Sequence, residues 1–155
     1  MSLRLRVATA SDLPALLALL ADDAIARERR GYAAEPSAAV QAAFEEISRD
    51  PNNELIVGEL EGDPSGAPVA CLQLTYIPGL SRGGMRRALV EAVRVRADLR
   101  GQGLGEQLMQ DAMARARARG CGLIQLTTDK RREAAHRFYA RLGFEASHEG
   151  MKRSL

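Results

Sequence analysis

The sequence predicts an α/β fold of the α+β kind, with a mixed, mostly antiparallel central sheet and helices on both faces. Apolar runs of strand length alternate with segments whose apolar residues recur at helical spacing. Runs 54–60 and 69–77 are separated only by turn residues and should form an antiparallel hairpin. Runs 88–95 and 122–127, the fourth and fifth strands, are joined through a long helix, so they should be parallel neighbours with a right-handed crossover. The 155 residues contain no linker or repeat, which favours a single domain over residues 1–155.

The elements of the first half follow from local patterns. Alternation predicts a strand at Leu3–Val7, and an apolar stripe from Leu13 to Ala24 predicts a helix. Ala38–Arg49 carries a second apolar helical face. The hairpin strands follow at Glu54–Leu60 and Val69–Ile77, with turn residues between them.

The second half contains the most regular helical pattern of the chain, from Gly103 to Arg119. It lies between a strand at Ala88–Val95 and a short apolar strand at Gly122–Thr127. A helix at Glu133–Leu142 should end at Gly143. The remaining predicted segments are a basic loop at Ser81–Arg87 and two final strands at Phe144–Ala146 and Met151–Ser154.

Composition excludes several classes of protein. Lys and Arg number 22 against 20 Asp and Glu, a net charge of +2 that is too balanced to predict nucleic-acid binding. No apolar run is long enough to cross a bilayer, and no signal peptide is recognisable, so we expect a cytoplasmic protein without a membrane partner. Cys71 and Cys121 lie in apolar surroundings outside any CxxC pair and are expected to be reduced. With only two histidines in the chain, no metal-ligand spacing is present.

A glycine-rich turn between a strand and the longest helix is the most informative segment. Arg100 precedes Gly101, Gly103 and Gly105, so backbone N–H groups, the helix dipole and a guanidinium meet there. This combination favours an anion site, most simply for a pyrophosphate, although a closely packed strand–helix turn would have the same glycines. The dinucleotide fingerprint fails because Glu106 stands where its last glycine would be, and no P-loop lysine follows.

Two motifs together resemble the GNAT (GCN5-related) N-acetyltransferase superfamily. The first is Arg-x-x-Gly-x-Gly at Arg100, Gly103 and Gly105; the second is the block Ala135–Phe144, which is similar to the family's A-x-x-F/L-Y-x-x-x-G-F motif. The resemblance covers nearly the whole chain and implies a GNAT-like fold that binds acetyl-CoA and releases CoA. It implies cofactor contacts at the fourth strand and the glycine turn: Val93, Arg94, Val95, Arg100, Gly101, Gln102, Gly103, Leu104 and Gly105. At Arg132 the family often has an asparagine that contacts the cofactor; the arginine could reach the cofactor's phosphates or lie on the surface.

The implied reaction requires a base, an oxyanion site and a proton for the departing thiolate. A lysine-like amine has a pKa of about 10.4, and Glu91 is our candidate for handling its proton. Glu91 lies in an apolar run, so it is either partly buried with a raised pKa or paired with Arg86 or Arg94. Tyr139 matches the family's tyrosine, which implies that its phenol protonates the thiolate; it could instead only pack under the cofactor. Backbone groups of the fourth strand would serve the oxyanion.

Other candidates for the acceptor side are weaker, and several functions stay open. Tyr32 and Tyr76 could line the acceptor site. His136 is expected on the surface, and His148 lies in the last loop, near where the resemblance places the substrate loops, with a proton relay as the alternative to a surface position. The main hypothesis is acetyl transfer to a primary amine of a small molecule by direct attack in a ternary complex. The alternatives are a peptide or protein N-acetyltransferase and a non-catalytic acyl-CoA-binding regulatory module. Proteins resembling this one are often dimers, so a homodimer is a further expectation by analogy.

Overall fold

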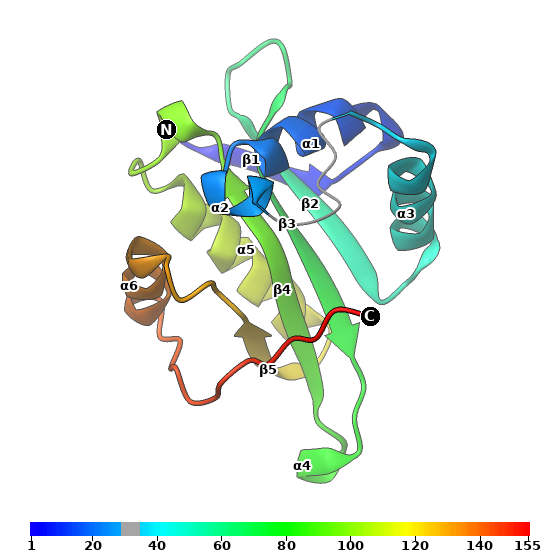
Figure 1. Ribbon diagram of the computed structural model, residues 1–155, viewed down its shortest axis with the longest axis vertical. Coiled ribbons are helices and arrows are strands. Elements are labelled where there is room, and N and C mark those ends of the chain that lie inside the picture. The colour runs from blue at the N-terminus through cyan, green and yellow to red at the C-terminus, as the bar shows by residue number, and fades with distance from the viewer. Residues whose placement is uncertain (29–34) are drawn as a thin grey trace.

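A computed structural model describes residues 1–28 and 35–155, and the described residues form a five-stranded sheet in the order β1-β2-β3-β4-β5 (Figure 1). Strands β1 to β4 pair antiparallel, and β5 pairs parallel to β4. The mixed, mostly antiparallel sheet predicted from the sequence is therefore confirmed. The strand bounds are Leu3–Val7, Asn53–Leu60, Pro68–Ile77, Arg86–Val95 and Cys121–Leu126.

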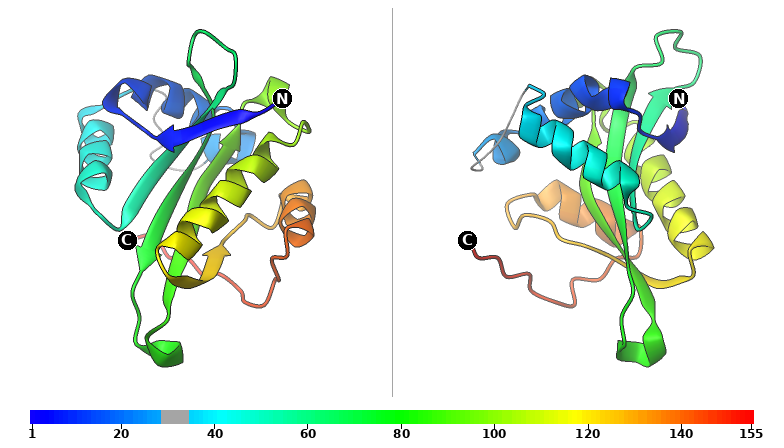
Figure 2. Two further views of the ribbon diagram at one scale, coloured as in Figure 1. Left: turned by 180° about the vertical axis from the view of Figure 1, so that it is seen from behind. Right: turned by 90° about the vertical axis from the view of Figure 1, so that its right-hand side faces the viewer.

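Helices cover both faces of this sheet (Figure 2). On one face, Leu16 and Leu19 of α1 and Phe44 of α3 pack against Val57 and Cys71. On the other face lies α5, whose buried residues recur at helical spacing. Helix α6 packs beside the start of α5. The described helices are α1 (Leu13–Ala21), α2 (Ala24–Arg27), α3 (Ala38–Arg49), α4 (Ser81–Gly84), α5 (Leu104–Ala118) and α6 (Glu133–Arg141).

The largest core cluster lies between the sheet and α5. Leu72 and Leu74 of β3 and Leu108 and Met109 of α5 are almost fully buried there. Alternation along β3 explains this arrangement, because residues two apart on a strand face the same layer. Complete burial of a leucine side chain contributes about 1.5–3 kcal/mol, so this layer supplies much of the fold's stability.

Strands β4 and β5 stay paired only over the first half of β4. Their register ends at Val90 opposite Leu126, whereas β3 and β4 continue to Ala70 opposite Val95. Within that second half, Leu72 of β3 faces two residues of β4 instead of one, which is a β-bulge, and Ala92 has φ 54°. The last residues of β4 therefore have an edge that β5 does not cover.

Two predictions for the chain's end are wrong. Neither Phe144–Ala146 nor Met151–Ser154 forms a strand. Phe144 packs on the core, but the strand predicted around it, Phe144–Ala146, is only three residues long. Met151 is 95% exposed, and its neighbours are polar, so no apolar face is present that burial in the sheet could stabilise. The predicted loop at Ser81–Arg87 contains the short α4 and the start of β4. No helix in the described part is long and apolar enough to cross a membrane.

Candidate active site

The glycine turn connects the open end of β4 to α5. Gly101 and Gly103 have φ of 75° and 81°, a region that residues with a Cβ rarely adopt. An added Cβ would meet no atom within 4 Å at either position, so backbone conformation rather than space requires glycine there. Gly103 is the N-cap of α5, and the first N–H groups of that helix have no carbonyl one turn earlier to bind. The turn therefore presents donors and a positive dipole end to any anion near it.

Gly105, in the first turn of α5, lies next to α6. A Cβ at this position would lie 3.4 Å from the Phe138 ring of α6. The next residue on α6 is Tyr139, whose ring makes edge contacts with Phe138 and Phe144 at centroid distances of 5.1 and 5.8 Å. These ring contacts hold Tyr139 on the side of α6 that packs against the core.

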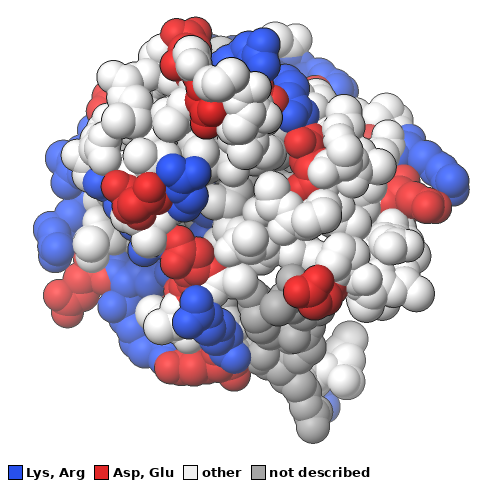
Figure 3. All heavy atoms as spheres, turned by 90° about the horizontal axis from the view of Figure 1, so that it is seen from above, with Lys and Arg blue, Asp and Glu red and all other residues white. Residues whose placement is uncertain are grey.

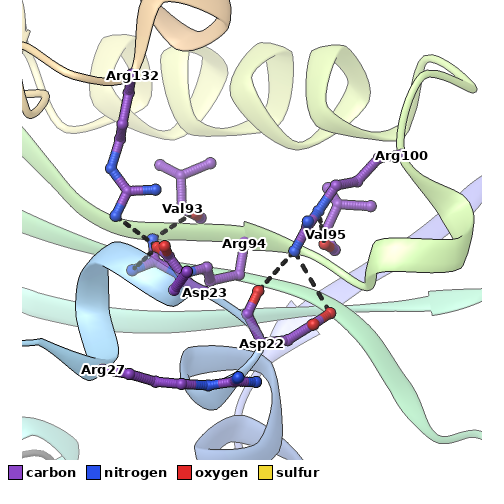
Figure 4. A pocket seen from close by; sticks show the side chains of 9 residues that line it. Asp22, Asp23, Arg27, Val93, Arg94, Val95, Arg100 and Arg132 are labelled. Carbon is purple, nitrogen blue, oxygen red and sulfur yellow. Dashed lines mark hydrogen bonds and ion pairs between the residues drawn. The ribbon is translucent and has the colours of Figure 1, made fainter.

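A pocket of about 340 Å³ lies beside the uncovered end of β4 (Figure 4). It brings together five of the predicted cofactor residues with the turn between α1 and α2. Among the described residues, four arginines and two aspartates dominate its lining. The lining residues are Asp22, Asp23, Ala24, Arg27, Val93, Arg94, Val95, Arg100 and Arg132.

The basic lining of the pocket differs from the mixed charge of the molecule's upper face. On the face seen from above, acidic and basic side chains are intermixed, and no single sign dominates (Figure 3). The whole chain carries a net charge of only +2. The concentration of guanidinium groups in one pocket is therefore a local feature, and it favours an anionic ligand.

Asp23 binds two arginines at one end of the pocket, and it was not among the residues predicted from the sequence. Its carboxylate caps α2 by accepting from Ile25 N and Ala26 N, and it pairs with Arg94 at 3.1 Å and with Arg132. Burial opposes ionisation of Asp23, but the hydrogen bond from Arg132 and the charge of Arg94 outweigh it, so the pKa of Asp23 lies below its usual value. In the sequence, Asp23 lies inside the stretch predicted as one helix, and its ion-pair partners are 71 and 109 positions away.

Arg100 lies at the other end of the pocket, next to Asp22 and Val95. Its Nη2 donates to the main-chain oxygen of Asp22 at 2.7 Å, and its Nε donates to Val95 O at 3.0 Å. Arg94 Nη1 similarly donates to Val93 O at 2.8 Å. The β4 carbonyls that β5 leaves uncovered are thus bound by arginine side chains, and each retains a second lone pair for a further donor.

Tyr139 lies within the electrostatic influence of this pocket. Burial raises the pKa of its phenol, and the charges of Arg94 and Arg132 oppose that rise in part. The group is therefore protonated at neutral pH and can serve as a hydrogen-bond donor.

Glu91 is on the side of the sheet that α1 and α3 cover. It lies opposite Gln73 in the pairing of β3 and β4, and the residue is exposed, so the expectation of partial burial is wrong. The expected pairing with Arg86 or Arg94 is also absent: Arg86 donates to Asn52 Oδ1 at 2.8 Å, and Arg94 binds Asp23. Among the described residues, none forms a hydrogen bond or ion pair with the Glu91 carboxylate.

The remaining sequence candidates lie apart from the pocket. Tyr76 is buried, and its hydroxyl donates to Glu54 Oε2 at 2.6 Å, so its expected place in the acceptor site is wrong. His136 is exposed on α6, and His148 is exposed beside Ser147. Tyr32 lies outside the described residues. Burial raises the pKa of Cys71 to about 12, and no three metal-ligating side chains cluster in the described part of the chain.

Comparisons with known proteins identify the class. The family model described as "Acetyltransferase (GNAT) family" matches residues 15–144. An L-methionine sulfoximine/L-methionine sulfone acetyltransferase of Pseudomonas aeruginosa is 32% identical over 149 residues, which cover 95% of this chain and 83% of the relative. A glucosamine 6-phosphate N-acetyltransferase of Trypanosoma brucei brucei is 34% identical over 92 residues, covering 59% and 60% of the two chains.

Solved structures agree with this assignment. A Trypanosoma brucei acetyltransferase superposes with a TM-score of 0.79 at 30% identity over 99% of both chains. A protein from Bacillus halodurans described as a transcriptional regulator superposes with a TM-score of 0.91 at 46% identity, again over 99% of both chains. Fold, motifs and relatives define an acetyltransferase. The chain belongs to the GNAT family and is an N-acetyltransferase, and enzymes of this family use acetyl-CoA as the acetyl donor.

Proposed function

We propose that this enzyme transfers an acetyl group from acetyl-CoA to the primary amine of a small molecule, by direct attack in a ternary complex. The observation that carries the proposal is the split between β4 and β5, which opens beside a basic pocket and ends at the glycine turn. Tyr139 is next to this split. Glu91 is in β4, on the side of the sheet that α1 and α3 cover. Bound acetyl-CoA would supply the thioester whose acetyl group is transferred.

The chain has suitable groups for each part of that cofactor. The backbone of Gly101, Gln102 and Gly103 and the first N–H groups of α5, at Leu104 and Gly105, would hold the pyrophosphate. Arg100 adds charge at this end, and Arg132 adds charge at the other end of the pocket. The uncovered backbone of Val93, Arg94 and Val95 would pair with the amide groups of the pantetheine arm, as an added strand pairs with a sheet edge.

Three groups of the chain would then carry the chemistry. Glu91 would accept the proton of the incoming amine, directly or through a water molecule. A backbone N–H of β4 at Val93 would donate to the developing oxyanion. Tyr139 would donate its phenolic hydrogen to the departing thiolate. Because its pKa is raised above about 10 while a thiol's is about 8.5, complete proton transfer is uphill, and its main contribution is a strong hydrogen bond to the thiolate.

The relatives support a small acceptor. Their names specify methionine sulfoximine or methionine sulfone, glucosamine 6-phosphate and aminoalkylphosphonates, all of which are small amines. The description of the Bacillus halodurans protein favours a second candidate, an acyl-CoA-binding regulatory module. In such a module, Glu91 and Tyr139 would have no catalytic role. A cytoplasmic location, which suits the reduced Cys71 and Cys121, and a homodimer complete the proposal.

Thiol release in the presence of amines tests the proposal directly. Purified protein with acetyl-CoA should release CoA in the presence of methionine sulfone, glucosamine 6-phosphate or 2-aminoethylphosphonate, and the product should be the N-acetyl compound. The background rate without amine is the control. Tight CoA binding with no amine-dependent release from a broad panel would favour the regulatory module, and acetylation of peptides alone would favour a protein acetyltransferase.

A further inference from the structure

Gln73 of β3 lies directly opposite Glu91 of β4 in the sheet. Directly paired residues point to the same side, and their Cβ atoms are about 4.5–5.5 Å apart. Cys71, two residues before Gln73 on β3, packs against α1 and α3, so Gln73 and Glu91 both face that layer. Gln73 is half-buried, whereas Glu91 is exposed. A neutral amide is thus paired with the carboxylate to which the proposed function assigns the proton of the amine.

Hydrogen bonds to β2 fix the orientation of the Gln73 amide. A carboxylate only accepts hydrogen bonds, so Asn53 turns its Nδ2 toward Asp50 Oδ2, at 2.6 Å. The Asn53 Oδ1 atom then accepts from Gln73 Nε2 at 3.2 Å and from Thr75 Oγ1 at 2.8 Å. The reverse orientation of the Gln73 amide would place two oxygens against each other. The nitrogen of Gln73 is therefore turned toward β2, and its oxygen is left for another donor.

Two hydrogen-bond acceptors on this face have no donor in the described part of the chain. Among residues 1–28 and 35–155, no group donates to Gln73 Oε1, and none donates to the Glu91 carboxylate. An amide oxygen and a carboxylate on directly paired residues suit a ligand that carries several N–H bonds on one atom. A primary amine is such a ligand, and it is the nucleophile of the proposed reaction.

Building on the proposed function, we propose that Gln73 binds the amine together with Glu91 and sets the preference of the enzyme for primary amines. The lone pair of the neutral amine forms the C–N bond, and the C–S bond breaks with its electron pair on sulfur. One N–H proton passes to Glu91, and the other hydrogen stays in the amide product. Gln73 Oε1 accepts this second N–H. A secondary amine gives its one N–H to Glu91 and loses the bond to Gln73. Asn53 is then a positioning residue, because it acts through Gln73.

Matched acceptors distinguish amine binding from a structural role of Gln73. Primary amines that the enzyme acetylates are compared with their N-methyl analogues, on the unmodified enzyme and on Gln73→Met, which keeps the side-chain length and removes the amide oxygen. Loss of one hydrogen bond should lower kcat/KM for the primary amine by about 3- to 10-fold. The value for the N-methyl analogue should stay within about twofold, so the preference for the primary amine falls.

Two results of this comparison would contradict the proposal in different ways. An equal loss for both acceptors, or no loss for either, would overturn the role of Gln73 and leave the acetyltransferase proposal intact. If the unmodified enzyme acetylates no amine, the proposed function fails, and the role of Gln73 fails with it.

The pH profile of Gln73→Glu gives a second readout, which a structural role would not move. This variant keeps an acceptor oxygen and adds a second carboxylate beside Glu91. Because like charges disfavour ionisation, the pKa that limits kcat/KM on the acid side should rise by about one pH unit. An unchanged acid limb would overturn the proposal. This measurement decides alone if Gln73→Met does not fold or if the N-methyl analogues react too slowly to measure.

Gln107→Met is the matched control for the loss of a glutamine. Gln107 belongs to α5, on the other face of the sheet, where it accepts from Leu3 N at 2.9 Å and donates to Met1 O at 3.0 Å. Its replacement should lower the Tm and change neither the preference for primary amines nor the pH profile. A fall in preference as large as that in Gln73→Met would assign both effects to general destabilisation and overturn the proposal.

Discussion

The two halves of β4 have opposite tasks. In the first half, Ala88 and Val90 are buried and lie between β3 on one side and β5 on the other. In the second half, Val93 and Val95 are only partly buried, and among the described residues β3 is their one strand neighbour. Charged side chains from α2, α6 and the glycine turn surround that end. The strand therefore contributes stability where both edges are paired, and it provides a binding edge where one is not.

The strongest way to break the binding half is Gly103→Glu. The change adds a carboxylate where the pyrophosphate would lie and forces a side chain into φ 81°, so we expect no measurable CoA binding by calorimetry. Gly62→Glu is the matched control, because Gly62 has φ 85° with equally open surroundings in the distant turn between β2 and β3. It should show similar strain and normal CoA affinity. Unchanged affinity in Gly103→Glu would remove the anion site from the glycine turn.

A substitution that disturbs the core at the first half of β4, where the strand pairs with both β3 and β5, should lower stability rather than ligand binding. Leu74 is fully buried opposite Val90, and Leu74→Ala should lower the free energy of unfolding by about 2–5 kcal/mol. Denaturant titration measures this change. The folded fraction should keep its KM values, since Leu74 faces α5 rather than the pocket. A large change in KM at full folding would contradict the division between the two halves.

The glycine turn and Tyr139 could be predicted from sequence because their motifs are local. Gly101 and Gly103 are required by backbone conformation, and the tyrosine belongs to a short motif on one helix. Asp22 and Asp23 could not be found this way, since their guanidinium partners come from β4, the glycine turn and α6. The environment of Glu91 was misjudged because its neighbours in sequence are apolar, whereas its exposure depends on which helix covers β4. The prediction of two final strands was wrong because those segments have no apolar face that burial in the sheet could stabilise.

Tyr139→Phe separates chemistry from packing at the border of the split. Loss of the hydrogen bond to the thiolate should lower kcat by about 10- to 100-fold, while CoA affinity stays nearly constant. Tyr76→Phe is a useful control, because that tyrosine donates to Glu54 Oε2 within the core and does not line the pocket. It should cost stability and leave kcat unchanged. Equal turnover of Tyr139→Phe and the parent enzyme would leave Tyr139 with a packing role only.

The smallest expected effect is the pH dependence of the stability that Asp23 contributes. Its pKa in the folded protein is lower than in the unfolded chain, so its contribution is present above about pH 4 and fades as pH falls toward the folded value. Asn retains the helix cap, so Asp23→Asn mainly removes charge. We expect it to cost about 1.5–3 kcal/mol at pH 7, with the difference from the parent shrinking below about pH 4. A difference that is constant from pH 7 to pH 3 would show that Asp23 contributes no charge-dependent stability.

Thermal unfolding with acetyl-CoA, free CoA and NAD tests most directly whether the split end of β4 binds the acetyl donor. At a ligand concentration about 100 times the dissociation constant, binding stabilises the folded state by roughly 2.7 kcal/mol. For a chain of this size, the Tm should rise by about 5–10 °C. The account predicts that rise with acetyl-CoA and CoA and none with NAD. An unchanged Tm at saturating acetyl-CoA would mean that the glycine turn and the arginine pocket do not form a donor site.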